Sequence, residues 1–320
     1  MARIMRILIG LPASGKSTYC RDLMNREPFR WVRISWDDIR HETPNYKFNR
    51  QNETRVIEQS FATARFAVAE GYELLIDNTN LNFSHQGRWS DLAEELSMKV
   101  ETKRFDTSVE ECVRRDALRK GAYAEGGSRV GRIVIERMAL ANGLISFPTD
   151  RQIVIVDVDG TLADNKHRTH RVEKTCQTCK GVVRTACEKC NGTGKVDGTD
   201  WKTFFRPELI LADPPRYPVA EWVRELYDYY TVLIVSGRPD NLAGEATVAW
   251  LAKNEIPYHH IFMRNGSDKR DDVLVKADIL KQLPEHRIAF CIDDRNRVVD
   301  MWREKGLHCY QVVSREEGDF

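Results

Sequence analysis

A glycine-rich stretch near the start of the chain constrains the fold more than any other feature. Residues 10–18 have the sequence Gly-Leu-Pro-Ala-Ser-Gly-Lys-Ser-Thr and directly follow an apolar run. A turn of this spacing, placed between a strand and a helix, holds the phosphates of a nucleoside triphosphate on its backbone N–H groups. The stretch therefore predicts a strand, a phosphate loop and a helix in that order.

The spacing also predicts which side chains hold ATP. Gly10 permits the tight turn, Gly15 allows close approach of the backbone, and Lys16 reaches the β and γ phosphates. The hydroxyl of Ser17 is the expected Mg²⁺ ligand. The ATP-binding set from this loop is Gly10, Ser14, Gly15, Lys16, Ser17 and Thr18.

A second motif lies near the midpoint of the chain. Residues 153–161 have the sequence Ile-Val-Ile-Val-Asp-Val-Asp-Gly-Thr, so two carboxylates follow a strand with one residue between them. This is the spacing of haloacid-dehalogenase-type phosphatases. In that chemistry Asp157 attacks phosphorus, while Asp159 protonates the leaving oxygen and then activates water.

Further parts of a phosphatase site follow in order. Ser236 and Arg238 come after an apolar strand and are expected to bind the phosphate. Lys276 is the expected partner of the phosphoryl charge, with Lys269 as the alternative. The expected Mg²⁺ ligands here are Asp157, Asp159, Asp293 and Asp294.

Strand and helix patterns alternate in both halves of the chain, which predicts an α/β protein with two doubly wound parallel-sheet domains. The expected domains are residues 1–148 and 149–320, joined by a linker at 146–150. Residues 162–201 interrupt the second pattern and predict a cap insert. The expected strands are 6–11, 31–35, 73–77, 99–105, 153–159, 230–236, 259–264, 287–294 and 308–313; helices are expected at 55–70 and 88–96.

Several residues favour phosphoryl transfer at the first site. Asp37 follows the second strand, where a carboxylate would accept a proton from an attacking hydroxyl, although Ser35 or Asp37 would equally cap a helix. Arg115 and Arg119 are expected to share a helix face before a glycine-rich lid at 121–128. Asp77 would support the metal or cap the next helix.

Composition excludes several classes of protein. The chain has 320 residues, of which 42% are hydrophobic, and its formal net charge of +1 does not indicate nucleic acid. No stretch approaches the roughly 20 apolar residues of a membrane span. The apolar start runs straight into the phosphate loop, so we expect no signal peptide and a cytosolic protein.

Four of the eight cysteines form two C-x-x-C pairs: Cys176, Cys179, Cys187 and Cys190. Two such pairs with glycines after them predict a tetrahedral Zn²⁺ site, with redox chemistry as the alternative. The segment also carries Arg168, Arg171, Lys174, Lys180, Arg184, Lys189 and Lys195. A cap that grips a nucleic-acid backbone and a purely structural staple are both open interpretations. Cys291 and Cys309 are expected in the core.

These motifs together resemble the phage-type polynucleotide 5′-kinase/3′-phosphatase family. The resemblance rests on residues 10–18, 37–40, 77–82, 157–161 and 292–303, and the cysteine insert departs from it. It implies that Asp37 is the general base, that Arg40 contacts the acceptor, and that Arg115 and Arg119 serve the donor phosphates. It implies removal of a 3′-phosphate or a 2′,3′-cyclic phosphate.

The resemblance further implies RNA or DNA ends as substrates, a functional link to a nucleic-acid ligase, homo-oligomers, and the cytoplasm of an infected bacterium. Two alternatives remain: a kinase–phosphatase for a small metabolite, and a nucleic-acid-binding protein with one inactive site. Residues 195–198, Lys-Val-Asp-Gly, match a ligase motif, but no second ligase motif accompanies them.

Overall fold

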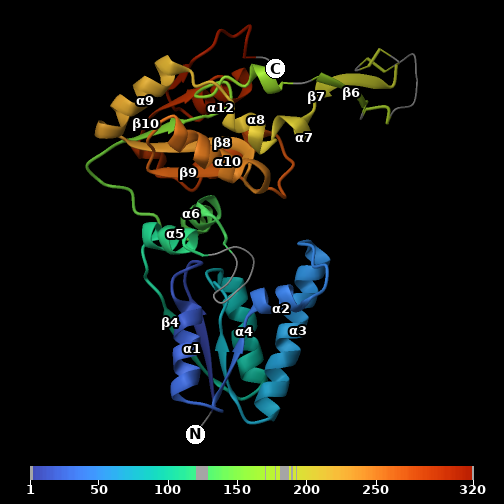
Figure 1. Cartoon of the computed structure of the whole chain (residues 1–320), viewed down its shortest axis with the longest axis vertical. Helices are drawn as coiled ribbons and strands as arrows, with labels where there is room; N and C mark the ends of the chain where they lie inside the picture. Colours follow the sequence, from blue (N-terminus) through green and yellow to red (C-terminus); the bar gives the residue numbers. More distant parts are fainter. Residues whose placement is uncertain are drawn as a thin grey trace. The chain divides into compact units, whose positions relative to one another are not determined.

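The structure is a computed structural model of the chain (Figure 1). It describes residues 3–119, 129–169 and 171–318, apart from residues 177, 181–186, 189 and 192. The expected lid at 121–128 lies outside these residues, as do Arg184 and Lys189. The chain divides into two compact units, Met1–Ile145 and Ser146–Phe320. No helix in the described part of the chain is long and apolar enough to cross a membrane.

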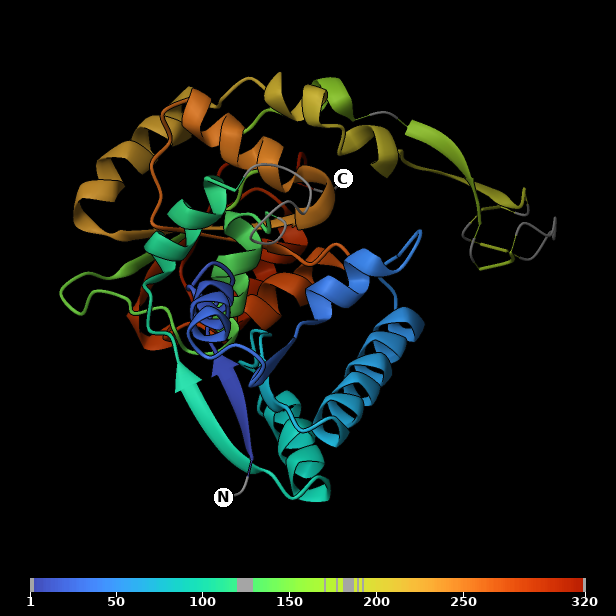
Figure 2. The same cartoon turned by 60° about the horizontal axis from the view of Figure 1, so that its bottom comes forward.

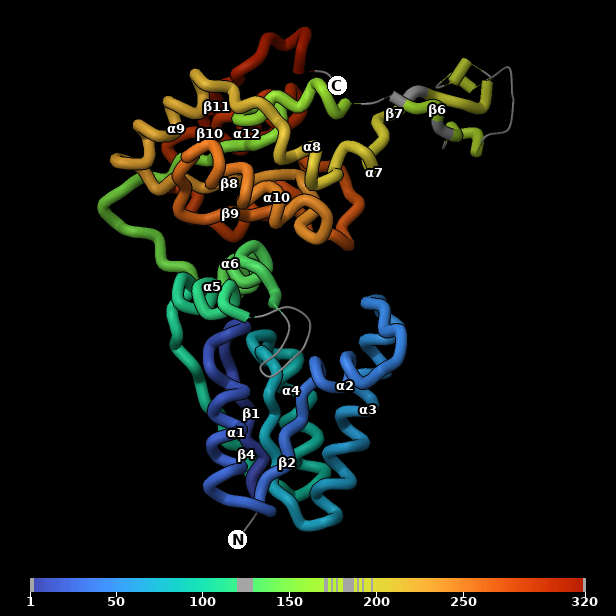
Figure 3. Tube along the Cα trace, viewed as in Figure 1, coloured from blue at the N-terminus to red at the C-terminus, as the bar shows by residue number. Residues whose placement is uncertain are grey.

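The first unit is built on a four-stranded parallel sheet of order β2-β3-β1-β4. Figure 3 labels β1, β2 and β4 of this sheet, and β3 lies between β2 and β1. The strands are β1 (Ile4–Ile9), β2 (Trp31–Ile34), β3 (Glu73–Ile76) and β4 (Lys99–Arg104). The helices are α1 (Lys16–Arg26), α2 (Trp36–Glu42), α3 (Arg50–Ala69), α4 (Phe83–Glu95), α5 (Val109–Ala117) and α6 (Arg132–Ala141).

Side-chain alternation along β1 explains why helices cover both faces of this sheet. Met5 and Ile7 pack in one core cluster with buried residues of α3 and α4. Leu8 packs in another cluster with Cys20 and Leu23 of α1. Successive side chains of a strand point to opposite faces, so the apolar run of β1 must be covered on both sides. The phosphate loop follows β1, which lies between β3 and β4 in the sheet. The order of the strands reverses here, because β2 and β3 lie on one side of β1 and β4 lies on the other.

The second unit contains a five-stranded parallel sheet of order β11-β10-β5-β8-β9. Its strands are β5 (Ile153–Val156), β8 (Thr231–Pro239), β9 (His260–Arg264), β10 (Ile288–Asp293) and β11 (Cys309–Gln311). Its helices are α7 (Trp201–Phe204), α8 (Pro207–Leu211), α9 (Tyr217–Tyr229), α10 (Asp240–Lys253), α11 (Asp272–Leu280) and α12 (Asn296–Glu304), with 3-10 turns at Lys166–Arg168 and Glu285–Arg287.

Strand order in this sheet reverses at β5, because β8 follows on one side and β10 and β11 lie on the other. Right-handed crossovers then place α9 and α10 on one face and α11 and α12 on the other. The packing agrees, since α10 contacts α8, α11 contacts α12, and both α10 and α11 contact β8. The carboxyl end of β5 is therefore a switch point, where open α/β sheets place their ligands.

The cysteine insert forms its own two-stranded antiparallel sheet, β6 (Arg171–Thr175) with β7 (Lys195–Thr199). Figure 2 shows this hairpin extending away from the five-stranded sheet. The expectation that the insert stays outside the sheet is confirmed. Cys291 and Cys309 are buried on neighbouring strands, as expected of core residues.

Candidate active sites

The phosphate loop joins β1 to α1 in the first unit. Gly15 is the N-cap of α1 with a φ of 103°, and no side chain caps this helix. Gly10 has a steric reason to be glycine, since a Cβ there would lie 2.7 Å from Ser14 Oγ and 3.0 Å from Phe105 Cβ. The uncapped N–H groups of α1 and the helix dipole favour an anion at this position.

Lys16 folds back over the loop. Its Nζ donates to the carbonyl oxygens of Gly10 at 3.0 Å and Leu11 at 2.7 Å. Burial lowers the pKa of Lys16, and the charge of Asp77 opposes that shift. Asp77 is itself buried at the end of β3 and accepts a hydrogen bond from Arg33 Nε at 2.6 Å. Asp77 does not cap the next helix, because Asn82 is the N-cap of α4.

At the start of α2, the residue that caps the helix is not Asp37. Ser35 is the N-cap and accepts from the Asp38 amide at 3.3 Å. The Asp37 side chain is 69% exposed and accepts from Arg40 NH1 at 2.6 Å. Arg40 also makes a two-point ion pair with Glu53, through Nε at 2.9 Å and NH2 at 2.6 Å. Glu53 was not predicted from the sequence; its place in the first turn of α3 fixes the Arg40 guanidinium beside Asp37.

The two arginines expected on one helix face are arranged differently. Helix α5 ends at Ala117, so Arg119 lies beyond it and the expected shared face is wrong. Arg115 remains close to the loop, with NH1 3.7 Å from the position of a Cβ on Gly15. Arg119 NH1 lies 3.5 Å from Asp116 Oδ1, and the charge of Arg119 contributes to lowering the pKa of Lys16. Both cations therefore lie near the phosphate loop without sharing a helix.

Residues 78–80 connect the strands beneath this site. Asn78 Oδ1 accepts from the Trp36 amide at 2.9 Å. Asn80 adopts a positive φ of 46°, and its Nδ2 donates to the carbonyl oxygens of Leu8 at 2.8 Å and Ile76 at 3.2 Å. These amides tie the end of β3 to β1 and to α2. They help to position the loop and the start of α2, which carries Asp37.

In the second unit, Lys276 joins two carboxylates. Its Nζ donates to Asp157 Oδ1 at 2.7 Å and to Asp293 Oδ2 at 2.8 Å. All three side chains are buried. Burial would lower the pKa of Lys276, but the charges of Asp157 and Asp293 raise it, so the amine stays charged. Lys269 instead donates to the carbonyl oxygen of Gly266.

Asp157, Asp293 and Asp294 form a compact acidic cluster in which one oxygen from each lies within 4.8 Å of the others. Burial and the charge of Asp293 raise the pKa of Asp294 to about 7, and burial raises the pKa of Asp157. Asp294 Oδ2 is buried and lacks a hydrogen-bond partner among the described residues. Three converging hard oxygen donors with an unsatisfied oxygen fit Mg²⁺.

Asp159 was also expected to be a Mg²⁺ ligand. Among the described residues, however, its carboxylate lies outside this cluster. Arg238 holds its carboxylate through Nε at 2.9 Å and NH2 at 2.7 Å, and Arg168 NH2 adds a third bond. Burial would raise the pKa of Asp159, but Arg238 and Arg168 lower it well below the ordinary value.

Arg168 corrects an expectation from the sequence. The sequence groups it with the basic residues of a cap that would grip a nucleic-acid backbone, but it is fully buried. It donates to Asp213 through Nε at 2.7 Å and NH2 at 2.9 Å, and Arg238 NH2 reaches the same carboxylate at 3.1 Å. Asp213 was missed because nothing in its local sequence marks it. Two buried guanidiniums and two carboxylates thus form one network, which offsets the cost of burying each charge.

The remaining phosphate-binding candidates, Ser236 and Arg238, were expected after a strand but lie within β8, which continues to Pro239. Ser236 is buried in β8, and its Oγ accepts from the Arg238 amide at 3.2 Å. The Arg238 guanidinium faces Asp159 and Asp213 instead of standing free for a phosphate. Gly160 has a φ of 77°, and a Cβ there would lie 2.0 Å from Asp294 Oδ2. Glycine is therefore required for the close approach of the two motifs.

The four cysteines of the insert converge at the tip of the β6–β7 hairpin. Their sulfur atoms can supply ligands within 4.8 Å of one another. Cys176 and Cys187 Sγ are 3.9 Å apart, and Cys179 and Cys190 Sγ are 3.7 Å apart. A hydrogen bond from the backbone amide of Cys179 is the largest influence that lowers the pKa of Cys176 to about 6. Thiolates are the form that binds metal.

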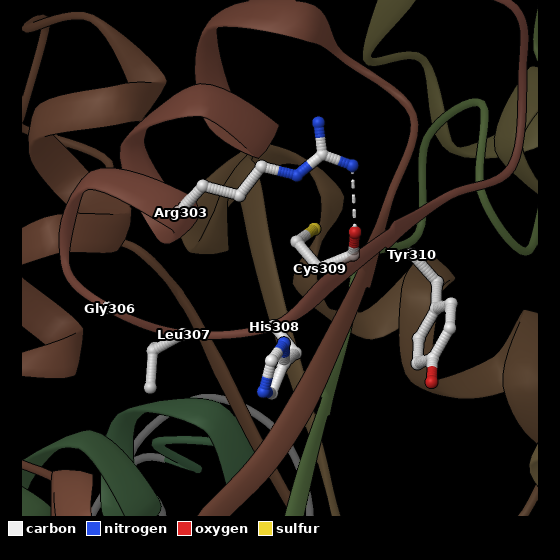
Figure 4. A pocket seen from close by; sticks show the side chains of 6 residues that line it. All are labelled: Arg303, Gly306, Leu307, His308, Cys309 and Tyr310. Carbon is white, nitrogen blue, oxygen red and sulfur yellow. Dashed lines mark hydrogen bonds between the residues drawn. The ribbon is translucent and has the colours of Figure 1, made fainter.

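A separate pocket opens at the turn between α12 and β11 (Figure 4). It measures about 440 Å³, and Arg303 donates to the Cys309 carbonyl oxygen at 2.9 Å beside it. None of the predicted site residues lines it. Its lining is Arg303, Gly306, Leu307, His308, Cys309 and Tyr310.

Family models match both units. Residues 191–320 match the phosphatase domain of polynucleotide kinase, and residues 5–141 match an AAA domain. A protein of Autographa californica nuclear polyhedrosis virus that bears the name bifunctional polynucleotide kinase/RNA ligase is 22% identical over 98% of this chain and 43% of its own length. The chain thus spans less than half of that relative.

Solved structures are also similar. A chain in the structure of the Pnkp1/Rnl/Hen1 RNA repair complex is 25% identical over 97% of this chain and 96% of its own, with a TM-score of 0.38. A haloacid dehalogenase-like hydrolase from Streptococcus pneumoniae is 16% identical over 51% of this chain and 85% of its own, with a TM-score of 0.35. The chain therefore has a P-loop kinase domain in its first half and, in its second half, a haloacid-dehalogenase-like domain that matches the phosphatase domain of polynucleotide kinase.

Proposed function

We propose that this protein heals nucleic-acid ends, adding a phosphate to a 5′-hydroxyl and removing one from a 3′ end. The observation that carries the proposal is the bridge from Lys276 to Asp157 and Asp293, at 2.7 and 2.8 Å. Lys276 and Asp293 lie in the part of this unit, residues 191–320, that matches the polynucleotide kinase phosphatase domain, and the same chain holds a complete phosphate loop. One chain thereby combines the two chemistries that leave a 5′-phosphate and a 3′-hydroxyl.

At the kinase site, the 5′-oxygen would attack the γ-phosphorus of ATP, and the bond from phosphorus to the β,γ-bridging oxygen would break. Asp37 would take the hydroxyl proton, and its exposure at the start of α2 leaves it accessible to an acceptor. Arg40, held by Glu53, would orient the acceptor. Lys16, Arg115 and Arg119 would neutralise the charge on the transferring group. The phosphate-loop residues Gly10, Ser14, Gly15, Ser17 and Thr18 would bind ATP.

At the phosphatase site, an Asp157 oxygen would form a bond to phosphorus while the bond to the 3′-oxygen breaks. Asp159 would give its proton to that oxygen, and later take one from the water that cleaves the aspartyl phosphate. Lys276 and the Ser236 hydroxyl would bind the phosphoryl oxygens. Arg238 and Arg168 would orient Asp159, because both guanidiniums contact its carboxylate.

Mg²⁺ fits both sites. In the phosphatase, Asp157, Asp293 and Asp294 would hold it, and the unpartnered Asp294 oxygen supports this assignment. In the kinase, Ser17 would be a ligand, and Asp77, whose charge raises the pKa of Lys16, would support the ion's water. The ion supplies positive charge that stabilises phosphoryl oxygens in the transition state.

Zn²⁺ fits the cysteine cluster. A Zn–S bond of about 2.3 Å sets tetrahedral sulfur atoms about 3.8 Å apart, and the observed separations are 3.7 and 3.9 Å. The Gly194 amide donates to Cys190 Sγ at 3.3 Å, as expected for a coordinating thiolate. A disulfide needs an S–S distance of about 2.05 Å, so these separations favour metal over redox pairing.

RNA ends are the proposed substrate, and a ligase is the proposed next enzyme. The viral relative combines polynucleotide kinase and RNA ligase in its name, while this chain spans only 43% of it. A ligase seals a 5′-phosphate to a 3′-hydroxyl, so it would consume the product of both sites. We place the protein in the cytoplasm, where four closely spaced thiols stay reduced.

One oligonucleotide tests both activities. It carries a 5′-hydroxyl and a 3′-phosphate, and both ends are followed with ATP and Mg²⁺ for the wild type, Lys16→Ala and Asp157→Ala. We expect Lys16→Ala to lose only phosphorylation and Asp157→Ala to lose only dephosphorylation. A parallel substrate with a 2′,3′-cyclic phosphate tests that extension, and RNA and DNA versions test preference.

A matched pair of lysines controls for general charge effects. Lys276→Met should abolish 3′-dephosphorylation. Lys269→Met should leave it intact, because the hydrogen bond that Lys269 makes among the described residues goes to a backbone carbonyl in its own turn. A wild-type protein that alters neither end of RNA or DNA would overturn the proposal. Phosphorylation and dephosphorylation of a small metabolite would then be the chemistry to measure.

A further inference from the structure

The cysteine hairpin is joined to the phosphatase site at both of its ends. Strand β6 begins at Arg171, three residues after Arg168, and strand β7 ends at Thr199, two residues before α7. Asp200 fixes the second junction, since it caps α7 by accepting from the Lys202 amide at 3.2 Å and the Thr203 hydroxyl at 2.6 Å. Both strands therefore enter the body of the unit through short connections.

The two ends meet each other at the base of the hairpin. Arg168 NH1 donates to the Phe204 carbonyl oxygen at 2.7 Å, and the Arg168 guanidinium lies 4.0 Å from the centre of the Phe204 ring. Trp201 packs on Phe204 and Phe205, with ring centres 5.3 and 5.7 Å away. The same Arg168 guanidinium holds Asp159. The base of the hairpin is thus part of the support of Asp159.

At the tip, the described residues pack around the cysteines. Its buried cluster consists of Cys176, Cys187 and Cys190, with Cys179 and Val196 packed against it. The hairpin between tip and base has five paired positions. A two-stranded hairpin is marginally stable alone in water, and small segments without a core depend on a metal.

We propose that metal loading of the cysteine knuckle positions Arg168 and thereby controls the phosphatase site selectively. The inference rests on the proposed phosphatase function. The metal would close the hairpin at its tip, which keeps β6 and β7 paired and holds Arg168 against Phe204 at the base. Without the metal, fraying strands would release this contact, and Arg168 would no longer orient Asp159. The kinase, which lies in the other compact unit, would not respond.

This positioning role differs from a nucleic-acid grip in what it affects. A grip acts on binding of a long substrate, so its loss raises KM for an oligonucleotide and depends on salt. A positioning role acts on the chemical step, so its loss lowers kcat, even for a nucleoside 3′-monophosphate that cannot reach the hairpin tip. The two roles are therefore separable by substrate size.

Three variants of the full chain test the proposal. Cys187→Ser removes one metal ligand, and Cys187→His keeps a Cys₃His set that binds zinc. Glu173→Gln is the matched control in the middle of the hairpin, where Glu173 is exposed and forms a surface ion pair with Lys195. Bound zinc is measured for each purified protein, together with amide hydrogen exchange of the peptide 199–205.

We expect Cys187→Ser to lose zinc, to exchange faster at 199–205, and to lose about tenfold to a hundredfold in phosphatase kcat on both substrates, the scale of a misplaced catalytic group. Its kinase rate should be unchanged. Cys187→His and Glu173→Gln should retain zinc, slow exchange and kcat.

A zinc-free Cys187→Ser protein with unchanged kcat and unchanged exchange at 199–205 would overturn the inference, as would a change confined to the KM of the oligonucleotide. A wild-type protein without any 3′-phosphatase activity would instead overturn the proposed function. Zinc content and exchange at 199–205 would still report whether the metal orders the base of the hairpin.

Discussion

Asp213→Asn is the most discriminating perturbation of the phosphatase unit. The Asp213 carboxylate is fully buried and accepts hydrogen bonds from Arg168 at 2.7 and 2.9 Å and from Arg238 at 3.1 Å. The only other carboxylate held by both arginines is that of Asp159, within the described residues. Removing one of two negative charges leaves two buried cations facing one carboxylate.

The magnitude follows from burial. Removing one partner of a buried ion pair costs about 3–5 kcal/mol, because the remaining charge is desolvated and uncompensated. The asparagine amide would add a second difficulty, since its NH₂ group would face guanidinium donors. Solvent screening does not reduce this cost, because the side chains of Asp213, Arg168 and Arg238 are all 0% exposed.

Asp300→Asn is the matched control. Asp300 makes the same kind of two-point pair with Arg315, at 3.0 and 2.6 Å, but the side chains are 44% and 56% exposed. Exposed pairs of this kind contribute about 0–1 kcal/mol. The same chemical change is thus made in a buried and in an exposed setting within one unit.

The assay must report on one unit at a time, because a chain of two units need not unfold in a single step. Amide exchange in α10 suits this purpose, since Trp250 donates to the Asp213 carbonyl oxygen at 2.8 Å. Amides of β1 in the other unit serve as the internal reference. Exchange should show about 3–5 kcal/mol less protection of α10 in Asp213→Asn, with phosphatase activity lost and kinase activity kept. Equal, small losses for both variants would refute the reasoning.

Two further predictions concern the acidic cluster. Gly160→Ala should lower phosphatase activity about a hundredfold, because the new Cβ would displace Asp294. The control is Gly306→Ala, since Gly306 has a similar φ of 80° but open space around it, and the phosphatase rate of this variant should match the wild type. An equal loss of activity in both variants would contradict the steric argument. The pKa of Asp294 is raised to about 7, so in EDTA the stability of the second unit should be full below the ordinary carboxyl pKa and fall as the pH rises toward 7. Urea unfolding at pH 5 and pH 7.5 measures this stability. The Asp294→Asn variant should show a smaller difference between the two pH values. A urea midpoint of the wild type that rises with pH in EDTA would contradict the prediction.

Much of this architecture is predictable because its signals are local. The apolar runs that form β1, β5 and β8 lie within one or two residues of the expected strand starts. Asp157 directly follows β5, Lys16 follows β1 through the phosphate loop, and Ser236 lies in the last part of β8. The topology of a parallel sheet brings such residues to its carboxyl edge. The compact cluster of Asp157, Asp293 and Asp294 follows from the same rule.

The failures arise where a side chain depends on partners far away in the sequence. An arginine in a polar, cysteine-rich segment is expected in solvent, yet Arg168 is buried because Asp159 and Asp213 neutralise it from positions 9 and 45 residues away. Arg119 was assigned to a helix by spacing, but α5 ends at Ala117 before that spacing applies. Residue type and periodicity carry no information about such pairings.

The two carboxylates of the midpoint motif show how the surroundings divide one chemistry between neighbours. Burial raises the pKa of Asp157, while Arg238 and Arg168 overcome burial and lower the pKa of Asp159. These directions oppose the proposed roles, because a nucleophile must be ionised and an acid protonated. A divalent cation would favour ionised Asp157, and a substrate phosphate would compete with Asp159 for Arg238. We therefore expect cation and substrate to set both protonation states, so that the site becomes reactive only when both are bound.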